Sequence, residues 1–363
     1  MNRRNLVVHN GSLENDGRVL RSLDLLSAVY SSDDNIVVCK SGKGYSGSFT
    51  VCEVDSLLCN IPLIGNFIWS LFAAVAVRGR YNTVYIHDYL SLIFMIFIGV
   101  FVKAKVKIYD AHEIILKDES GYSNYKGYWR NLEKRYIEDF NCVICANAER
   151  ALYVEDYYGL KVIPIVIPNF LEAFVENTTA PHVSVPPVFV YQGALTKDRE
   201  LHRFFDFIAK LDFEFKLKII GAGPEEFYLQ RYAEKLGIAA SVEWVGRVSR
   251  SVLYDMLVQA DFGVIYYDHK GLNTRMCAPN KIFEYAAMGL PVITSSQQSL
   301  FNVVTKNKLG VVIGRSEEVG FKELDCVIND YEYFSKKSLD FARVNSWSLR
   351  RPVLIDELKK HIS

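Results

Sequence analysis

Residues 279–293 have the sequence PNKIFEYAAMGLPVI. This stretch predicts a short helix, because Pro279 suits a first helical turn and Gly289 is typical of a helix end. The apolar residues Leu290 to Thr294 after it predict a buried strand, and Phe262 to Tyr267 before it predict another. Two strands joined by a helix form a βαβ unit. We therefore expect this helix to begin at the carboxyl edge of a parallel sheet.

The spacing within this helix separates an apolar face from two charged residues. We expect the residues that contact the sheet to be Ile282, Phe283, Ala286 and Ala287. Lys281 and Glu284 are three residues apart, and we expect them to share one outward edge. That edge could be an ordinary surface ion pair. It could also bind a nucleoside diphosphate, with Lys281 and the helix dipole at the phosphates and Glu284 at the ribose hydroxyls.

The composition favours a globular chain with two domains. Its 363 residues exceed what one core usually supports, and half of them are apolar. The 42 basic residues balance the 42 acidic residues, so no overall field attracts nucleic acid. Any anionic ligand must therefore be bound by a local group of residues.

The seven cysteines are scattered along the chain, and no signal peptide is visible before the predicted strand Leu6 to Val8. These features predict a reducing, cytoplasmic location. Cys142 and Cys145 have the C-x-x-C spacing, but they lie in an apolar strand and no second pair accompanies them. We interpret them as core residues rather than as a metal or redox site.

Two apolar segments approach the roughly 18 to 20 residues that a membrane-spanning helix needs. Residues 61–77 are followed by two arginines, and residues 90–102 are followed by three lysines. Apolar helices with basic ends could rest on an anionic membrane surface. Crossover helices buried on a parallel sheet have the same pattern, so both interpretations stay open from these segments alone.

Strand and helix patterns alternate in two separate regions. The first region predicts about six parallel strands, and the proline-bearing segment 171–187 interrupts the alternation as a linker does. A second α/β region follows. We assign residues 1–170 to a first domain and residues 188–340 to a second, and we expect residues 341–363 to form a C-terminal helix that packs back on the first domain.

Several predicted strands of the first domain end in polar residues, which is where α/β folds bind ligands. Asn10, Gly11, Asp16 and Arg18 follow the first strand, and two later strands end in His87-Asp88 and in His112-Glu113. His112 could contact a ligand, or it could cap or pack a helix. Its place at a strand end favours the functional role.

In the second domain, Gly221-Ala222-Gly223 resembles the start of a dinucleotide fingerprint. The third glycine of that pattern would fall at Glu226, and its carboxylate and that of Glu225 would repel a pyrophosphate. We therefore reject a dinucleotide site. The tight turn could still bring the backbone close to an uncharged nucleobase.

Seven segments, in this order, resemble the GT-B nucleotide-sugar glycosyltransferases, specifically family 4. They are residues 15–19 (NDGRV), 109–113 (YDAHE), 167–169 (IPN), 191–195 (YQGAL), 220–224 (IGAGP), 244–246 (WVG) and 279–292 (PNKIFEYAAMGLPV). The resemblance covers nearly the whole chain. It implies an α/β protein of GT-B type, in which two Rossmann-like domains face each other across a cleft.

The resemblance also implies how a nucleotide-sugar donor is bound. The family holds the donor diphosphate with a basic pair, which maps to Arg199 and Lys281, and holds the ribose with the last glutamate of an E-x7-E motif, which maps to Glu284. The first glutamate of that motif would fall at Met276, as in a subgroup of polysaccharide-assembly enzymes with P-N-K in this segment. Main chain around residues 273–278 is the implied substitute for reading the donor sugar. The implied donor contacts are Gly193, Arg199, Gly221, Gly223, Val245, Asn280, Lys281 and Glu284.

Catalysis is implied to rest on charge stabilisation without a metal or a further cofactor. Arg199 and Lys281 would stabilise the leaving diphosphate, and His112 would contact the donor sugar or the transition state. No D-x-D motif occurs in the sequence. The implied acceptor-side residues are Asn10, Gly11, Asp16, Arg18, His87, Asp88 and Glu113.

We therefore expect a retaining glycosyltransferase that extends a lipid-linked bacterial surface polysaccharide, such as O-antigen or capsule, at the cytoplasmic face of the membrane. Its partners would be a nucleotide-sugar donor, a saccharide or lipid-linked acceptor and an anionic membrane surface, with no nucleic acid. Two alternatives stay open. One is a sugar-nucleotide epimerase of the same fold, and the other is a non-catalytic nucleotide-sugar-binding partner, which Met276 favours.

Overall fold

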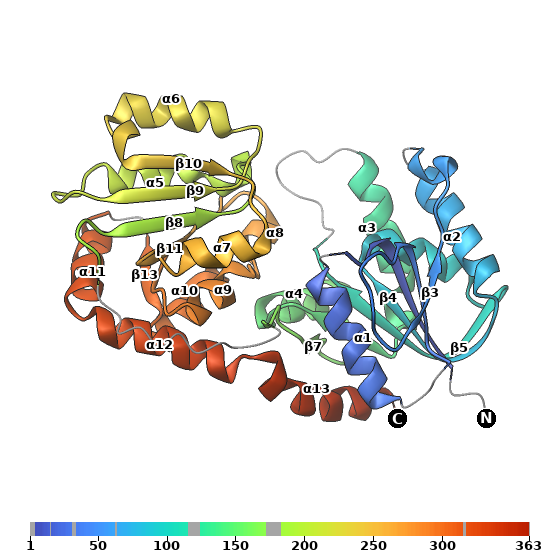
Figure 1. Cartoon of the computed structure of the whole chain (residues 1–363). Coiled ribbons are helices and arrows are strands. Elements are labelled where there is room, and N and C mark those ends of the chain that lie inside the picture. The colour runs from blue at the N-terminus through green and yellow to red at the C-terminus, as the bar shows by residue number, and fades with distance from the viewer. Residues whose placement is uncertain are drawn as a thin grey trace. The chain divides into compact units, whose positions relative to one another are not determined.

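The computed structural model describes residues 4–14, 16–30, 34–61, 64–114, 124–171, 183–314 and 317–362. The chain forms two compact units, the first of Met1–Asn169 with Arg350–Ser363 and the second of Phe170–Leu349. Each unit is built on one parallel β-sheet with helices packed beside it (Figure 1). The predicted α/β class with two Rossmann-like units is therefore confirmed. Most of the predicted linker, residues 172–182, lies outside the described residues.

The first unit contains a seven-stranded sheet in the order β3-β2-β1-β4-β5-β6-β7. Its strands are β1 (Asn5–Ser12), β2 (Ile36–Ser41), β3 (Thr50–Glu53), β4 (Gly79–His87), β5 (Val102–Ala111), β6 (Cys142–Cys145) and β7 (Ile165–Val166). The central strands are in register at their carboxyl ends, where His9 pairs with His87 and His87 pairs with Asp110. This alignment brings together polar residues that are far apart in the sequence.

The helices of the first unit cover a core that includes the buried rings of Trp69 and Trp129. They are α1 (Gly17–Val29), α2 (Ile64–Ala76), α3 (Asn124–Tyr136) and α4 (Ala148–Tyr158), with the 3-10 helices η1 (Leu57–Asn60), η2 (Tyr89–Phe97) and η3 (Ile137–Asp139). Among the described residues, no helix is both long and apolar enough to cross a membrane.

The prediction of an apolar crossover helix over residues 90–102 is wrong in type and extent. The 3-10 helix η2 ends at Phe97, and β5 begins at Val102, which pairs with Gly79 of β4. Val102 is fully buried, whereas Lys103 and Lys105 are exposed, so the basic residues belong to a strand and not to a helix end. Pairing with β4 has therefore overridden the local helical pattern.

The second unit contains a six-stranded sheet in the order β10-β9-β8-β11-β12-β13. Its strands are β8 (Val188–Gln192), β9 (Lys216–Ile220), β10 (Val242–Gly246), β11 (Phe262–Ile265), β12 (Val292–Ser295) and β13 (Gly310–Ile313). Its helices include α5 (Leu201–Ile208), α6 (Glu226–Leu236), α7 (Arg250–Leu257), α8 (Leu272–Arg275), α9 (Lys281–Ala287), α10 (Gln298–Asn307), α11 (Glu317–Asn329) and α12 (Tyr331–Val344), with the 3-10 turns η4 (Lys197–Arg199) and η5 (Ala239–Ser241). The β11-α9-β12 unit predicted from residues 262–294 is present.

Helix α9 is oriented differently from the prediction. Its most buried large side chain is Tyr285, and the ring lies where a side chain on Gly263 of β11 would otherwise be. Phe283, expected on the sheet, stacks on Phe341 of α12 instead, with 5.6 Å between ring centroids. The predicted outward edge is also wrong, because Nζ of Lys281 is buried. Rotation of the helix about its axis to place Tyr285 on the sheet explains all of these differences.

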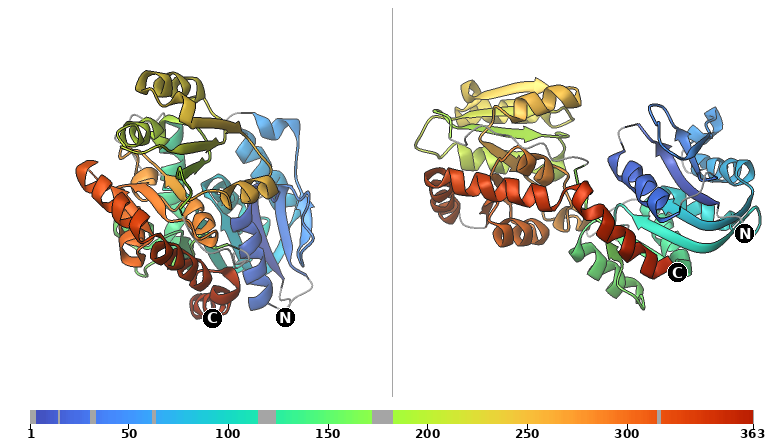
Figure 2. Two further views of the ribbon diagram at one scale, coloured as in Figure 1. Left: turned by 60° about the vertical axis from the view of Figure 1, so that its left-hand side comes forward. Right: turned by 60° about the horizontal axis from the view of Figure 1, so that its bottom comes forward.

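The last helix, α13 (Trp347–Ile362), follows α12 and is drawn in red in Figure 2. Its residues from Arg350 onward belong to the first unit. There the Arg351 guanidinium binds the Asp24 carboxylate of α1 at 2.6 and 3.1 Å.

Candidate functional site

A pocket of about 590 Å³ lies at the carboxyl ends of β8 and β9, beside the start of α9. The structure brings five of the predicted donor residues into its lining. They are Gly193, Gly221, Asn280, Lys281 and Glu284. The pocket therefore occupies the place where parallel α/β sheets bind ligands.

Two glycine turns shape this pocket. Gly221 has φ of +145°, and a Cβ atom there would collide with the carbonyl oxygen of Gly193. Gly193 has φ of +131°, and its Cβ atom would lie 2.8 Å from Nζ of Lys281. Both turns therefore require glycine, and the second one leaves the space that the Lys281 side chain fills.

Three predicted donor residues are outside the lining. Gly223 has a packing role, because a Cβ atom there would collide with the carbonyl oxygen of Leu195. Val245 packs against the apolar core of the unit. Arg199 holds its guanidinium 4.3 Å from the centroid of the Tyr267 ring, and Tyr267 lines the pocket. Arg199 is thus next to the pocket rather than in its wall.

Lys281 carries an ammonium group that is buried without a hydrogen-bond acceptor in the described part of the chain. Its Nζ lies 4.4 Å from the centroid of the Tyr191 ring and 5.9 Å from that of Tyr267. Burial lowers the pKa of Lys281 to about 7, and the nearby charge of Arg199 acts in the same direction. A buried cation without a hydrogen-bond acceptor is costly even with the Glu284 carboxylate nearby, and a bound anion would reduce that cost.

Glu284 lies in the same wall as Lys281. Its carboxylate accepts a hydrogen bond from the side-chain amide of Gln192, and burial raises its pKa while the positive charge of Arg250 opposes this change. The amide oxygen of Gln192 is buried and has no partner among the described residues. The wall therefore offers both hydrogen-bond acceptors and a cation to one ligand.

We predict that Lys281 makes the stability of the ligand-free protein depend on pH. The pKa of Lys281 is about 7 in the folded chain and 10.5 without the fold, so between these values the unfolded chain binds a proton that the folded chain does not. Stability then rises with pH across this window. Lys281→Met should therefore stabilise the protein most at pH 7 and below, and its advantage should shrink by about 1 kcal/mol per pH unit up to pH 10.

Urea denaturation of both proteins at pH 6.5, 8 and 9.5 measures this difference. A change in packing alone would give a difference in unfolding free energy that is the same at every pH, and that result would contradict the buried-ammonium interpretation.

The first unit contains a buried polar network at the carboxyl ends of β4 and β5. Nδ1 of His87 lies 3.1 Å from Nε2 of His112 and 3.5 Å from the Asp110 carboxylate. Tyr85 donates its hydroxyl to Asp110 at 3.1 Å, and Arg18 binds the same carboxylate through Nε and Nη2. Burial alone would raise the pKa of Asp110, but Arg18 and both histidines hold it well below its usual range. Asp110 is thus the ionised centre of the network.

Most of the other predicted acceptor-side residues have local partners. Asn10 donates to Asn66 at 2.9 Å, Asp16 caps α1 by accepting from two backbone N–H groups, and a Cβ atom on Gly11 would lie 2.5 Å from His9. Asp88 caps η2, and burial raises its pKa to about 6, whereas Glu113 is exposed. Contact of these residues with an acceptor stays a prediction.

The atoms of His87, Asp110 and His112 lie within 4.8 Å of one another, close enough to hold a metal ion. The charge balance favours a hydrogen-bonded network instead. Asp110 is the only anion of the three, and its charge is already balanced by the buried guanidinium of Arg18. A divalent cation at this place would carry two uncompensated charges in a buried environment.

We predict that the ion pair between Arg18 and Asp110 is required for the stability of the first unit. Asp110→Asn leaves the guanidinium buried without its counter-charge and should cost about 3 to 5 kcal/mol of unfolding free energy. The control is Glu234→Gln, which breaks an exposed ion pair with Arg231 and should cost about 1 kcal/mol or less. Urea denaturation measures both, and equal losses would show that Arg18 is not the reason for the cost.

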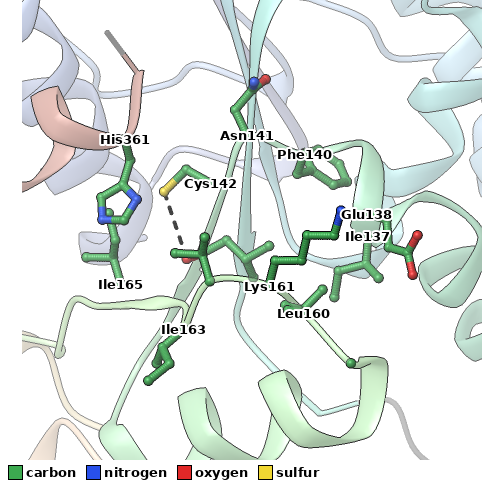
Figure 3. A pocket seen from close by; sticks show the side chains of 13 residues that line it. Ile137, Glu138, Phe140, Asn141, Cys142, Leu160, Lys161, Ile163, Ile165 and His361 are labelled. Atoms are coloured by element: carbon green, nitrogen blue, oxygen red, sulfur yellow. Dashed lines mark hydrogen bonds between the residues drawn. The ribbon is translucent and has the colours of Figure 1, made fainter.

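A pocket of the first unit, of about 300 Å³, lies between β6, β7 and the end of α13 (Figure 3). Its lining is largely apolar and contains none of the predicted site residues. Cys142 lines it, and burial raises the pKa of Cys142 and of Cys145 to about 12. Both thiols are therefore un-ionised at neutral pH, as expected of core residues.

Comparison with known proteins agrees with this geometry. Residues 186–324 match a family model described as Glycosyl transferases group 1. Over its full length, the chain superimposes on sucrose-phosphate synthase from Thermosynechococcus elongatus with a TM-score of 0.71, 15% identity and 99% coverage of both chains. The chain has the GT-B fold. The fold expected from the sequence is therefore confirmed.

Other similarities point in the same direction. The chain is similar to Anabaena HepE in complex with UDP-glucose, with a TM-score of 0.68, 15% identity and coverage of 98% of this chain and 99% of that one. An uncharacterized glycosyltransferase of Haemophilus influenzae is 27% identical over 242 residues, which are 62% of this chain and 62% of that protein. The match thus spans under two thirds of the relative's length.

Sequence reasoning missed several residues of both sites. Gln192, Tyr191 and Tyr267 stand at the ends of β8 and β11, and Asp110 stands two residues before His112. A polar or aromatic residue at a predicted strand end was the available signal for each. The burial of Lys281, in contrast, had no signal in the spacing of its own helix.

Proposed function

We propose that this GT-B protein is a glycosyltransferase that moves a sugar from a nucleotide-sugar donor to a growing, lipid-linked surface polysaccharide. The observation that carries the proposal is the pocket in which a buried, unpartnered ammonium of Lys281 stands beside the Glu284 carboxylate. An anion and a hydroxylated group on one ligand match these two residues, and a nucleoside diphosphate provides both.

The similarities support a nucleotide-sugar donor and a surface-polysaccharide acceptor. One structural neighbour is HepE in complex with UDP-glucose, and another is the lipopolysaccharide outer core galactosyltransferase WaaB, with a TM-score of 0.68 and 14% identity. The group 1 family match covers the same part of the chain as the pocket. Each of these neighbours supplies a precedent for one half of the proposed reaction.

The chemistry follows from where charge develops. When the bond between the anomeric carbon and the diphosphate oxygen breaks, negative charge grows on the diphosphate, and the sugar becomes oxocarbenium-like. We propose that Lys281 and Arg199, which lie over the rings of Tyr191 and Tyr267, stabilise that charge without a metal. The acceptor oxygen then bonds to the anomeric carbon, its proton goes to the leaving phosphate, and we propose that the anomeric configuration is retained. His112 is proposed to contact the donor sugar.

We predict that donor affinity depends on the ammonium of Lys281. Lys281→Met should weaken the binding of the best nucleotide among UDP, GDP and dTDP by about 10- to 100-fold at pH 6.5, because a charge-assisted hydrogen bond is lost. Glu284→Gln should weaken binding by about tenfold through the ribose. The matched control is Lys306→Met, which removes an exposed lysine of α10 in the same unit.

Isothermal titration calorimetry measures these affinities. Wild-type affinity in both pocket variants would show that the nucleotide does not bind beside α9. Binding with no sugar transfer to any acceptor would favour the non-catalytic alternative, and conversion of the donor to its epimer would favour the epimerase.

A lipid-linked acceptor requires the protein to reach a membrane surface. An apolar patch on η1, α2 and the segment after η2 has exposed side chains at Leu57, Ile61, Ile64, Phe67, Phe72, Val75, Val100 and Phe101. The ring centroids of Phe67, on α2, and Phe97, at the end of η2, lie 5.5 Å apart. This contact brings α2 next to the segment after η2. Lys103 and Lys105 are exposed on β5 and can attract anionic lipid. These features support a peripheral location on the inner face of the membrane.

We predict that this apolar patch binds anionic vesicles. Wild-type protein should sediment with phosphatidylglycerol vesicles at low salt. The double variant Leu57→Ser, Ile64→Ser should reduce the bound fraction several-fold, because it removes two exposed apolar side chains. Leu57 is 89% exposed and Ile64 is 58% exposed. Leu152→Ser removes a similarly exposed leucine of α4 and should have no effect. Wild-type protein that stays in the supernatant would contradict the peripheral location while leaving the donor site untouched.

A further inference from the structure

The pocket of about 300 Å³ in the first unit lies at the edge of the sheet opposite the buried polar network. Cys142 and Ile165, which line it, are the first residues of β6 and β7. His87 and Asp110, in contrast, stand at the carboxyl ends of β4 and β5. A ligand in this pocket would therefore occupy a place that the proposed sugar transfer does not use.

The inner wall of the pocket is apolar and buried. Phe140, Cys142, Val143 and Ile165 line it, and each of them is at most 9% exposed. The thiol of Cys142 donates to the carbonyl oxygen of Val143 at 3.9 Å, as the dashed line in Figure 3 marks, and it is un-ionised at neutral pH. An apolar group of a ligand gains free energy when it leaves water for such a wall.

The wall is held in place by contacts on its far side. The Phe140 ring stacks on Tyr109 of β5, with 5.2 Å between the ring centroids. Asn141 binds Lys107 twice at 2.9 Å, because its backbone N–H donates to the Lys107 carbonyl and its side-chain oxygen accepts from the Lys107 N–H. A wall that is already ordered loses little conformational freedom when a ligand binds.

The mouth of the pocket also has apolar residues. Val162 and Ile163 line it and are 60% and 53% exposed, so apolar surface continues from the buried wall out to solvent. The aliphatic residues form most of the lining, and one face of its aromatic ring, Phe140, is taken by Tyr109. This shape favours a flexible alkyl chain over a flat aromatic ligand, which would need a free ring face to stack on.

The polar groups of the lining stand at its rim. Lys161 is exposed and lies directly before Val162, and His361 comes from the last turn of α13, which also carries Lys359 and Lys360. The lining contains one carboxylate, that of Glu138, and Figure 3 shows it directed away from the other lining residues. A cation beside an apolar cavity suits a ligand with a negatively charged end.

We propose that this pocket binds the alkyl chain of an amphiphile with an anionic head group, with the chain on the apolar wall and the head beside Lys161. The site is independent of the proposed sugar transfer. A free fatty carboxylate and an anionic phospholipid have this chemistry in common, and its volume is at the lower end of the range of about 300 to 1,000 Å³ for ligand pockets.

Calorimetry with decanoate, decanol and butyrate, each below its micellar concentration, tests the proposal. Wild-type protein should bind decanoate more tightly than decanol and should not bind butyrate, whose chain is too short to cover the wall. Lys161→Met should weaken decanoate about fivefold and leave decanol unchanged, because it removes the exposed ammonium and keeps the apolar stem. The double variant Val162→Ser, Ile163→Ser should weaken both ligands about tenfold.

Matched controls lie in the same unit but outside the lining. Lys134→Met removes an exposed lysine of α3, and Leu152→Ser removes an exposed leucine of α4, so both should bind decanoate as the wild type does. The Leu57→Ser, Ile64→Ser variant of the apolar patch should also keep wild-type affinity. Loss of decanoate binding in that variant would assign the ligand to the patch and overturn the pocket site.

Other results would also overturn the proposal. They are the absence of decanoate binding to wild-type protein, or equal affinity in the Val162→Ser, Ile163→Ser variant and in Leu152→Ser. Decanol binding as tight as that of decanoate would overturn the anionic head. Titration with dioctanoyl-phosphatidylglycerol then separates the two sources, since tighter binding than decanoate indicates a phospholipid and weaker binding indicates a free carboxylate.

Discussion

The contact between Tyr285 of α9 and Gly263 of β11 fixes the binding edge of the second unit. Glycine leaves room for the ring, so the helix approaches the sheet closely, and the buried hydroxyl of Tyr285 accepts a hydrogen bond from the backbone N–H of Gln192 at 3.1 Å. The helix is thereby held against β8 and β11 at once. Lys281 lies one turn before Tyr285. Its side chain reaches Gly193 at the end of β8 and lines the pocket there. The orientation of Lys281 thus follows from a packing contact between two residues that do not line the pocket.

This arrangement lowers the stability of the empty protein in order to prepare a site. An ammonium group that is buried over aromatic rings has lost its water, and the cation–π attraction and the nearby charges of Glu284 and Asp198 compensate for this only in part. Arg199 adds a second positive charge nearby, and its Nε is also buried without a hydrogen bond among the described residues. Unfavourable local arrangements of this kind are expected at functional sites, where a ligand completes the missing interactions. The strained backbone of Glu200 belongs to the same category.

The sequence allowed the fold to be predicted well, because alternating apolar strands and helices determine a parallel sheet almost locally. The β11-α9-β12 unit and the division into two units followed from such patterns. The errors arose where tertiary contacts decided the outcome. The pairing of Val102 with Gly79 replaced an expected helix end by a strand, and the ring of Tyr285 rotated α9 so that Lys281 became buried. Asp110 was missed as a site residue for a similar reason, since only the register of β1, β4 and β5 shows that it meets His87 and Arg18.

The two units differ in how they balance buried charge, and this difference bears on what each of them binds. In the first unit the buried carboxylate of Asp110 is paired with Arg18, so the network with His87 and His112 needs no ion from outside. In the second unit the buried charge of Lys281 has no such partner among the described residues. A low-dielectric site with an unbalanced positive charge selects an anion, whereas a balanced polar site selects a ligand by hydrogen bonds. Charge balance therefore distinguishes the two units, because the described part of the second unit contains a buried cation without a hydrogen-bond acceptor, whereas the polar network of the first unit is balanced internally.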